Sequence, residues 1–459
     1  MMKRIVLSIC LFAICANCIW AEDHVMAATK KAEVRDVPAE LNLSLSEAQD
    51  YAVSTNRSLR NASLAVQKAY AQRWQTIASM LPQVDMSWGY TSMMGYKMVM
   101  EMGTGVTNPV TGEEVKRSME IPMNDNGTFG LTAAVGINGQ AIVGALLNNV
   151  AIDMQKLNLQ QSEDNLRANV KTSYASVLVL QHVVTLLESS LANIEQMAEM
   201  TQRSVDVGAA EQTSADLIKV RVNTLKNNIN ANLRSTQLAL NALKVLLDVP
   251  AETTLTLSST LEDFLSAEAV LALLGNDFVL ENNLNYQLLE KNVDLAKKNV
   301  HMAGWAYGPT VALAYQYSEK SYFGKAAGMN MTPPNALSLN ISMPLWSSGK
   351  RAAGVVEKKI ALEEARNTFE ETANNLGIQN EQLRYNLQNG YETYINEKDN
   401  MDVTQRVFES TTNKFNQGAA SNLDLVNASN DLISAQSNYV QAVLTLVNAQ
   451  VELEKFLNL

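Results

Sequence analysis

The residue types that carry enzyme chemistry are sparse and scattered in this chain. Its three histidines, His24, His182 and His301, lie far apart, and the sequence contains no HExxH, no metal-spaced cysteine pair and no GxxxxGK[ST] motif. No spacing favours a Ser/His/Asp grouping. His182 falls within a helical pattern, where a packed or exposed histidine is the usual case. We therefore expect no enzyme, no catalytic residue, no metal site and no cofactor.

Methionine is locally enriched. Residues 80–123 hold 9 of the 20 methionines, and the run MMGYKMVMEM falls in a long loop expected at residues 91–128. Thioether sulfur can bind soft ions such as copper(I) or silver. Methionine also builds adaptable apolar surfaces, and this second interpretation of the loop is favoured. Binding of a soft metal ion by the loop stays open as an alternative.

The charge balance bears on possible partners. The 459 residues include 36 Lys and Arg against 47 Asp and Glu, a net charge of −11. Nucleic-acid binding requires a basic face, so no nucleic acid is expected as a partner. Only 18% of residues are charged, below the roughly 25% of ordinary soluble domains. Such a composition suits long helices that contact water along one side.

Residues 1–21, MMKRIVLSICLFAICANCIWA, have the features of a secretory signal peptide. Lys3 and Arg4 precede an apolar stretch, and the small Ala21 ends the segment. All three cysteines lie inside it, so the mature chain should depend on packing instead of disulfides. No long uninterrupted apolar run follows, and we expect no transmembrane helix. The exported protein is then periplasmic, extracellular or an outer-membrane barrel.

The rest of the chain contains one series of elements twice, within residues 45–250 and 270–459. Each copy starts with a helix that ends before a proline, Pro82 or Pro309, because proline lacks an N–H and restricts the residue before it. Two strands, a very long helix, a glycine turn and a shorter returning helix follow. The expected helices are 59–81, 144–206, 213–247, 284–307, 350–417 and 422–457, and the expected strands are 84–90, 129–138, 311–317 and 337–343.

These lengths predict an architecture. In each copy the two shorter helices together match the long one, so they would stack end to end beside it and form a long helical cylinder. Residues 251–280, with a strand-like segment and a short apolar helix, would form a belt around the middle. The predicted domains are a signal peptide at 1–21, a first repeat at 22–250, an equatorial linker at 251–280 and a second repeat at 281–459.

The four predicted strands alternate strictly between an apolar and a polar face. A membrane-spanning sheet must close, and four strands are too few, whereas three copies provide twelve. The small, wettable residues of the polar face suit an open lumen. The alternative is the edge of a small soluble β-sandwich. Four aromatic residues near strand ends predict an interfacial girdle: Trp88, Tyr90, Tyr315 and Tyr317.

This order of elements resembles the TolC family of outer-membrane efflux proteins over essentially the whole mature chain. Two local patterns support the resemblance. The segment ISMPLWSSG at 341–349 is similar to the family's strand-to-helix passage, although its counterpart in the first repeat, GQAIVG at 139–144, is degenerate. FNQG at 415–418, followed by NLDL at 422–425, resembles the turn at the periplasmic tip.

The resemblance implies a mainly α fold with a small β part. A long periplasmic α-helical barrel would adjoin a 12-stranded trimeric transmembrane β-barrel, with four strands per protomer, in the cell outer membrane. The implied partners are two further copies of the chain, outer-membrane lipid, a periplasmic adaptor (membrane fusion) protein and an inner-membrane pump of the RND or ABC type.

The implied function is the exit duct of a tripartite efflux pump that exports small molecules such as drugs. A type I protein-secretion outlet stays open as an alternative, because the inner-membrane pump chooses the cargo. A periplasmic coiled-coil adaptor without a pore is another alternative, and the alternating strands count against it.

The resemblance also assigns a periplasmic pore entrance. The family has acidic residues shortly after the second glycine turn, which correspond here to Asp424 and Asn427. A ring of carboxylates around a narrow axis would favour cations. Asp424 could equally cap the returning helix, and the two roles are compatible. The family's latch residues are replaced by Phe415, Ala420 and Ser214, so that latch is not expected.

The two glycine turns are candidates for adaptor docking. Their small residues, Gly208, Ala209, Gly418 and Ala419, would permit close contact between helix tips. Ordinary turn chemistry explains the same residues equally well, since glycine suits the left-handed position after a helix.

Overall fold

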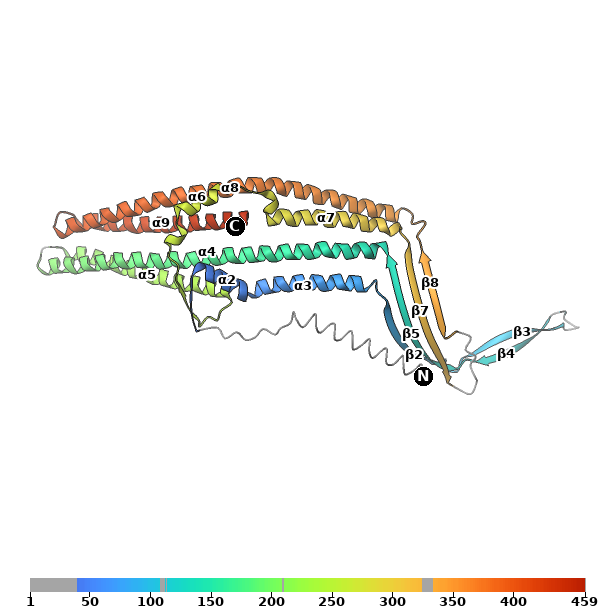
Figure 1. Ribbon diagram of the computed structural model, residues 1–459. Helices are drawn as coiled ribbons and strands as arrows, with labels where there is room; N and C mark the ends of the chain where they lie inside the picture. The colour runs from blue at the N-terminus through green and yellow to red at the C-terminus, as the bar shows by residue number, and fades with distance from the viewer. Residues whose placement is uncertain (1–38, 108–111, 113, 209, 324–332, 459) are drawn as a thin grey trace. The chain divides into compact units, whose positions relative to one another are not determined.

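The computed structural model describes residues 39–107, 112, 114–208, 210–323 and 333–458 (Figure 1). The predicted signal peptide and Ala209 lie outside the described residues. The chain divides into two compact units. Unit 1 comprises the described parts of residues 1–68, 153–292 and 366–459, and unit 2 comprises those of residues 69–152 and 293–365. Both units therefore draw on both sequence repeats.

The helices that the sequence predicts are present, with ends that shift by a few residues. Asn56 separates the first of them from an additional short helix, α2 (Leu45–Thr55). The side-chain oxygen of Asn56 accepts hydrogen bonds from the N–H groups of Ser58 and Leu59, as expected at a helix start. The predicted helices are α3 (Arg57–Ala78), α4 (Gly139–Asp206), α5 (Gln212–Leu247), α7 (Leu284–Gly304), α8 (Lys350–Asn416) and α9 (Asn422–Leu457).

Helix α4 packs through one apolar stripe. Val170, Tyr174 and Val177 are fully buried, and their spacing places them on one helix face. Among the described helices, α4 is the one with a stretch apolar enough, by length and composition, to cross a membrane, whereas the sequence predicted none. Val170 and Tyr174 belong to the core of unit 1, so packing within that unit explains much of this apolar character.

Unit 1 has two clusters of buried apolar side chains. The larger cluster joins Ala48 of α2 with Val170 of α4, Leu243 of α5, Leu387 of α8 and Leu446 of α9. The smaller cluster lies near the two glycine turns and again joins α4, α5, α8 and α9. Its buried members are Ile194, Met197, Ile218, Val222, Leu225, Phe408, Leu425, Ala428 and Leu432.

Residues 251–280 are attached to unit 1 by a parallel strand pair and a buried tyrosine. Strand β6 (Thr254–Leu257) pairs with β1 (Glu40–Leu43), and η1 (Glu262–Phe264), α6 (Ala267–Gly275) and η2 (Leu280–Asn282) follow. The Tyr174 hydroxyl of α4 donates to the Leu43 carbonyl at 2.9 Å and accepts from the Ser259 N–H at 3.0 Å. Its ring stacks on Phe264. The Tyr174 side chain therefore joins α4 to the end of β1 and to the segment that follows β6.

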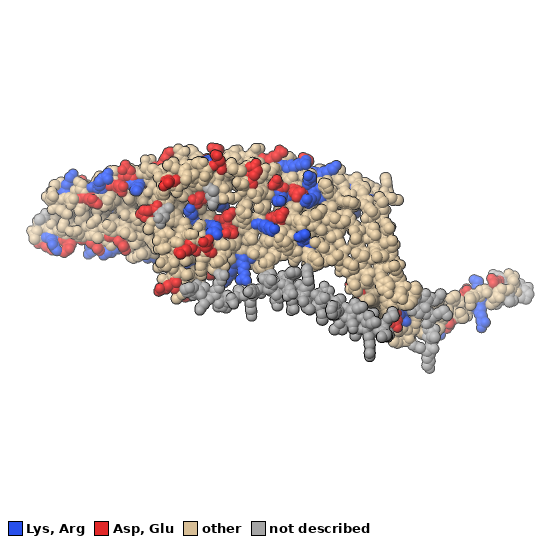
Figure 2. All heavy atoms as spheres, in the orientation of Figure 1, with Lys and Arg blue, Asp and Glu red and all other residues tan. Residues whose placement is uncertain are grey.

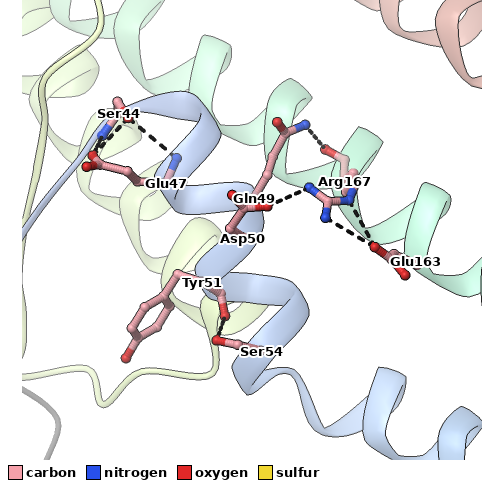
Figure 3. Close-up of polar contacts among 8 residues, drawn as sticks. All are labelled: Ser44, Glu47, Gln49, Asp50, Tyr51, Ser54, Glu163 and Arg167. Carbon is pink, nitrogen blue, oxygen red and sulfur yellow. Dashed lines mark hydrogen bonds and ion pairs between the residues drawn. The ribbon is translucent and has the colours of Figure 1, made fainter. Parts of the chain in front are cut away.

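A polar network joins α2 to α4 (Figure 3). The Arg167 guanidinium donates to Asp50 at 2.9 Å and to Glu163 at 3.1 Å, and Gln49 donates to the Arg167 carbonyl. Ser44 and Glu47 form a capping box at the start of α2. Because Arg167 remains partly exposed, the ion pairs orient α2 more than they stabilise it.

Unit 2 contains an antiparallel four-stranded sheet, as predicted. Its strands are β2 (Gln83–Thr91), β5 (Asp125–Asn138), β7 (Thr310–Phe323) and β8 (Asn335–Ser342), in the spatial order β2-β5-β7-β8. Strand β7 continues to Phe323, six residues beyond its expected end at 317. Charged side chains are scarce on this sheet until its end near β3 and β4 (Figure 2): β8 carries none and β2 carries only Asp85.

The expectation of one long loop at 91–128 is wrong. Strands β3 (Lys97–Thr107) and β4 (Glu114–Pro122) form a separate antiparallel hairpin within it, and β5 already begins at Asp125. Cross-strand ion pairs, Lys97–Glu120 at 2.8 Å and Lys116–Glu101 at 3.6 Å, support the hairpin. These ion pairs form only in the observed pairing register of β3 with β4. That register cannot be recognised in the sequence, so the composition of the segment suggested a loop.

Replacement of Tyr174 by phenylalanine tests the attachment of residues 251–280. The change leaves the Leu43 carbonyl and the Ser259 N–H without their partner in a buried place, so we expect the free energy of unfolding to fall by about 2 kcal/mol. Tyr439→Phe is the matched control, because Tyr439 is also buried, whereas burial and neighbouring ionisable groups, and no hydrogen bond, raise the pKa of its hydroxyl. Denaturant titration should show a clear loss for the first variant only; equal losses would contradict this account.

Candidate functional site

The sheet of unit 2 has one apolar face and one face of small or polar residues. Directly paired residues of an antiparallel sheet share a face. One row of the apolar face is Val84, Ala133, Tyr315 and Leu337, and the next row on the opposite face is Asp85, Thr132, Gln316 and Ala336. All residues of β2 and β8 are exposed. Within the described chain, neither face of these strands is covered.

Both edges of this sheet are open. Strand β2 pairs only with β5, and β8 pairs only with β7, among the described residues. Because each neighbouring pair is antiparallel, β2 and β8 run in opposite directions. Each edge presents a row of backbone N–H and C=O groups without partners in the described chain, which is a template for pairing with another strand.

The four predicted girdle residues lie on the apolar face. The register places Tyr90, Trp88, Tyr317 and Tyr315 in four successive rows of that face. Trp88 is 74% exposed. The tyrosine hydroxyls have polar partners, since Tyr90 donates to Asp125 and Tyr315 donates to Asn335. Tyr315 and Tyr317 lie inside β7 rather than at its end, opposite the start of β8.

A second aromatic group, which was not predicted from the sequence, lies at the other end of the sheet. Trp305 and Tyr307 follow α7, and Trp346 precedes α8; all three are exposed. Arg351 lies over the Tyr307 ring at 5.3 Å and donates to the Pro344 carbonyl. Aromatic residues beside Pro309 and Pro344, where helix and strand meet, were the available signal.

The two glycine turns have the expected left-handed backbone. Gly208 and Gly418 have φ values of 75° and 73°. A Cβ added at either glycine would meet no atom within 4 Å, so backbone conformation, and not close packing within the chain, requires glycine there. The Ala419 N–H donates to the Lys414 carbonyl at 2.8 Å and closes the second turn. Ala209 is outside the described residues.

Asp424 caps α9. The Ser421 hydroxyl accepts a hydrogen bond from the Asp424 N–H, and the Asp424 carboxylate accepts from the Ser421 hydroxyl at 2.7 Å and from its N–H at 2.9 Å. These bonds, that of the hydroxyl first, lower the pKa of the Asp424 carboxyl below its ordinary value of 3.8. The capping role considered from the sequence is therefore present, and the exposed carboxylate stays charged near neutral pH.

Asp424 begins a polar stripe on α9 that the sequence analysis recognised only in part. Asn427 lies three residues on, and Asp431, Ser434 and Asn438 continue the same helix face. All of these residues are exposed, whereas Leu425, Ala428 and Leu432 on the neighbouring face are buried. The missed residue is Asp431, which the spacing of seven from Asp424 could have identified.

The corresponding positions after the first turn differ in chemistry. Ser214 and Leu217 of α5 replace Asp424 and Asn427, and Leu217 is exposed together with Val220 and Val207. The N-terminus of α5 lacks a side-chain cap at Glu211. The first tip is therefore more apolar, and the second is acidic and capped.

Comparisons with known proteins agree with this geometry. Residues 277–459 match the family model described as outer membrane efflux protein. The chain is 23% identical over 359 residues to outer membrane efflux protein BepC of Brucella suis biovar 1 (strain 1330). The matched region covers 75% of each chain. Its fold is similar to the CmeC outer membrane channel of Campylobacter jejuni, with a TM-score of 0.67, 16% identity and coverage of 90% of this chain and 85% of that one. The fold is also similar to the open-state MtrE outer membrane channel of Neisseria gonorrhoeae, with a TM-score of 0.65 and 17% identity. This match covers 90% of this chain and 88% of that one.

The fold is thus that of outer-membrane channels, with long helices and a small β part, as predicted. The family model covers residues 277–459, and the likeness in fold to outer-membrane channels extends over 90% of the chain. The relative and the solved channels that the chain resembles are described as outer-membrane proteins.

Gly418→Ala should destabilise the second turn. Alanine in the left-handed conformation costs about 1 kcal/mol. Gly354→Ala is the control, because Gly354 lies inside α8 with open space around it, and alanine there should add about 0.5–1 kcal/mol of helix stability. Denaturant unfolding of both variants should give shifts of opposite sign. Shifts of the same sign would contradict the assignment of the turn.

Proposed function

We propose that the protein is the exit duct of a tripartite efflux pump and works as a homotrimer. The observation that carries this proposal is the pair of open edges on the four-stranded sheet. In lipid, unpaired backbone groups are too costly, so the sheet must close on itself or on copies. Four strands are too few to close alone, and three copies give a barrel of twelve strands.

The strand directions suit this closure. Because β2 and β8 run in opposite directions, β8 of one copy pairs antiparallel with β2 of the next when copies are arranged around an axis. The two edges also have similar lengths, nine and eight residues. The apolar face then meets outer-membrane lipid, and the face of small and polar residues lines the lumen.

The two aromatic groups fit the two membrane surfaces. Trp88, Tyr90, Tyr315 and Tyr317 form the girdle toward the β3–β4 end of the sheet, with tyrosine hydroxyls bonded to polar groups. Trp305, Tyr307 and Trp346 lie at the end next to the helices. Aromatic side chains with polar tips favour such interfaces.

The helices also carry exposed apolar residues that neighbouring copies would cover. On α5 these are Leu217, Val220, Leu233, Leu238 and Val245, and on α8 they include Ile360 and Ile378. Contiguous exposed apolar surface indicates interaction with another protein surface. Closure of the helices into a periplasmic barrel would bury part of it.

The polar stripe of α9 forms the periplasmic entrance in this proposal. Asp424, with Asn427 and Asp431 on the same face, contributes carboxylates from each of three copies. A narrow ring of like charges attracts cations and repels anions. The capping hydrogen bonds of Asp424 fix its carboxylate and leave it charged.

The tips at Gly208 and Gly418, with Ala209 and Ala419, receive the periplasmic adaptor protein, and the adaptor connects the duct to an RND or ABC pump in the inner membrane. The pump supplies the energy and selects the cargo, here small molecules such as drugs. The domain division proposed with this function is a signal peptide at 1–21, repeats at 22–250 and 281–459, and a linker at 251–280.

Cysteine cross-linking tests the closure of the barrel. The chain after residue 21 has no cysteine, so pairs can be introduced at will. Ser87→Cys combined in turn with Ser338→Cys, Asn340→Cys or Ser342→Cys places thiols on the polar faces of β2 and β8. Oxidation should yield covalent trimers for at least one pair. Ser87→Cys with Gly130→Cys is the control, because these register partners should cross-link within one chain. Monomers for all edge pairs would contradict closure.

Charge removal at the entrance should change ion selectivity. In planar bilayers, Asp424→Asn and Asp431→Asn should each reduce the preference for cations, and the double variant should reduce it further. Asp216→Asn is the control, since Asp216 of α5 is exposed but points away from the face of Ser214 and Leu217. Unchanged selectivity in the double variant would leave Asp424 as a helix cap only.

The pH dependence of this selectivity follows from the lowered pKa of Asp424. A depressed carboxyl pKa keeps the charge, and the capping contribution to stability, present above the ordinary value and removes both as the pH falls through the folded-state value. Cation preference should therefore persist from neutral pH down to about pH 5. Loss of the cation preference already between pH 7 and pH 6 would contradict the assignment of this preference to the Asp424 carboxylate.

A further inference from the structure

The β3–β4 hairpin has two chemically different faces. One face carries the ion pairs Lys97–Glu120 and Lys116–Glu101. The register places Met98 opposite Ile121, Met100 opposite Met119 and Met102 opposite Arg117 on the other face. Four methionines therefore share one surface, hereafter the methionine face: Met98, Met100, Met102 and Met119.

Three of these thioethers are close enough to meet at one point. Met100 and Met119 are directly opposite, which places their Cβ atoms about 4.5–5.5 Å apart. Met98 lies two residues from Met100 on the same face, about 7 Å away, and diagonal to Met119. The flexible methionine side chain can bring its sulfur toward a common centre over such distances. Met100 and Met119 are more than 40% exposed, so an ion can reach them.

The choice of residue at these positions points to sulfur chemistry. Strands favour β-branched and aromatic residues, and Val, Ile or Phe would provide an equivalent apolar face. Instead, every β3 position on this face from 98 to 102 is methionine. Within the described residues, no group of three His, Cys, Asp or Glu could hold a metal ion. Ligands for hard cations are therefore absent from the hairpin face, whereas soft thioethers are concentrated on it.

Arg117 restricts the location of the centre. Arg117 is opposite Met102 on the methionine face, and its positive charge repels a bound cation. The centre is therefore expected toward Met98 and away from Met102.

We propose that Met98, Met100 and Met119 form a thioether site for a soft monovalent metal ion, copper(I) or silver(I), on the β3–β4 hairpin. The site shares no residue with the open sheet edges or with the stripe at Asp424, and it does not depend on the proposed function. It gives the methionine-rich segment a ligand class that the sequence alone left as the less favoured alternative.

Silver(I) binding to the purified mature protein in detergent tests the site, with nitrate as the counter-ion and no halide in the buffer. Silver is a suitable probe because it has no redox change under these conditions, and because the chain after residue 21 contains no thiol to compete. We expect isothermal titration to reveal one ion per chain. The triple variant Met98→Leu, Met100→Leu and Met119→Leu keeps the apolar face and should weaken binding at least about tenfold.

The matched control is Met154→Leu with Met302→Leu and Met401→Leu, three methionines on helices. It should bind silver as the wild type does, and background binding to histidines is the same in all variants. Arg117→Met removes the repelling charge and adds a thioether, so it should tighten binding. This variant also guards against loss of binding through misfolding of the hairpin. Equal silver binding by the wild type and the hairpin triple variant would overturn the proposal, as would the absence of tighter binding in Arg117→Met.

Discussion

The pairing of backbone N–H and C=O groups in lipid is the constraint on which the rest of this protein depends. The four-stranded sheet leaves the outer edges of β2 and β8 unpaired in the described chain, and a membrane offers no water to satisfy their backbone groups. The same strands expose both faces, one apolar and one small and polar. In lipid, such a sheet requires closure into a continuous wall, and this requirement is the basis of the proposed assembly.

The long helices of unit 1 must also pack against one another, and they do so with few buried apolar residues. Narrow buried stripes, such as Val170, Tyr174 and Val177 on α4, hold the helices together, and uncharged polar residues fill much of the remaining surface. Directional contacts fix what the stripes leave free. Tyr174 joins α4 to β1, to Ser259 and to η1. Arg384 of α8 donates to the carbonyls of Leu274 and Asn276 at the end of α6. Lys171 of α4 forms an ion pair with Glu454 of α9.

Local patterns in the sequence predicted most of the fold. Prolines 82 and 309, the glycines at 208 and 418 and the strict alternation of the strands each report a backbone requirement, so helices and strands were placed within a few residues. The β3–β4 hairpin was missed because its support comes from cross-strand ion pairs. The extension of β7 to Phe323 was missed for a similar reason, since residues 318–321 are polar or charged and the segment is held by the ladder to β5.

The candidate site was only partly predictable. Asp424 was identified through the family pattern, and its local cap with Ser421 could be read from the spacing of the two residues. Asp431, Trp305 and Trp346 carried signals that become persuasive only when the helix face or the strand end is known. What a second copy contributes is not encoded in any local pattern, because it depends on which edges remain open after one chain has folded.

The most direct test of this account is the mass of the intact mature protein released from detergent in native mass spectrometry. Closure of three four-stranded sheets predicts a single species with three times the mass of the mature chain. A folded monomer or dimer as the dominant species would contradict the closed twelve-stranded wall and, with it, the proposed duct.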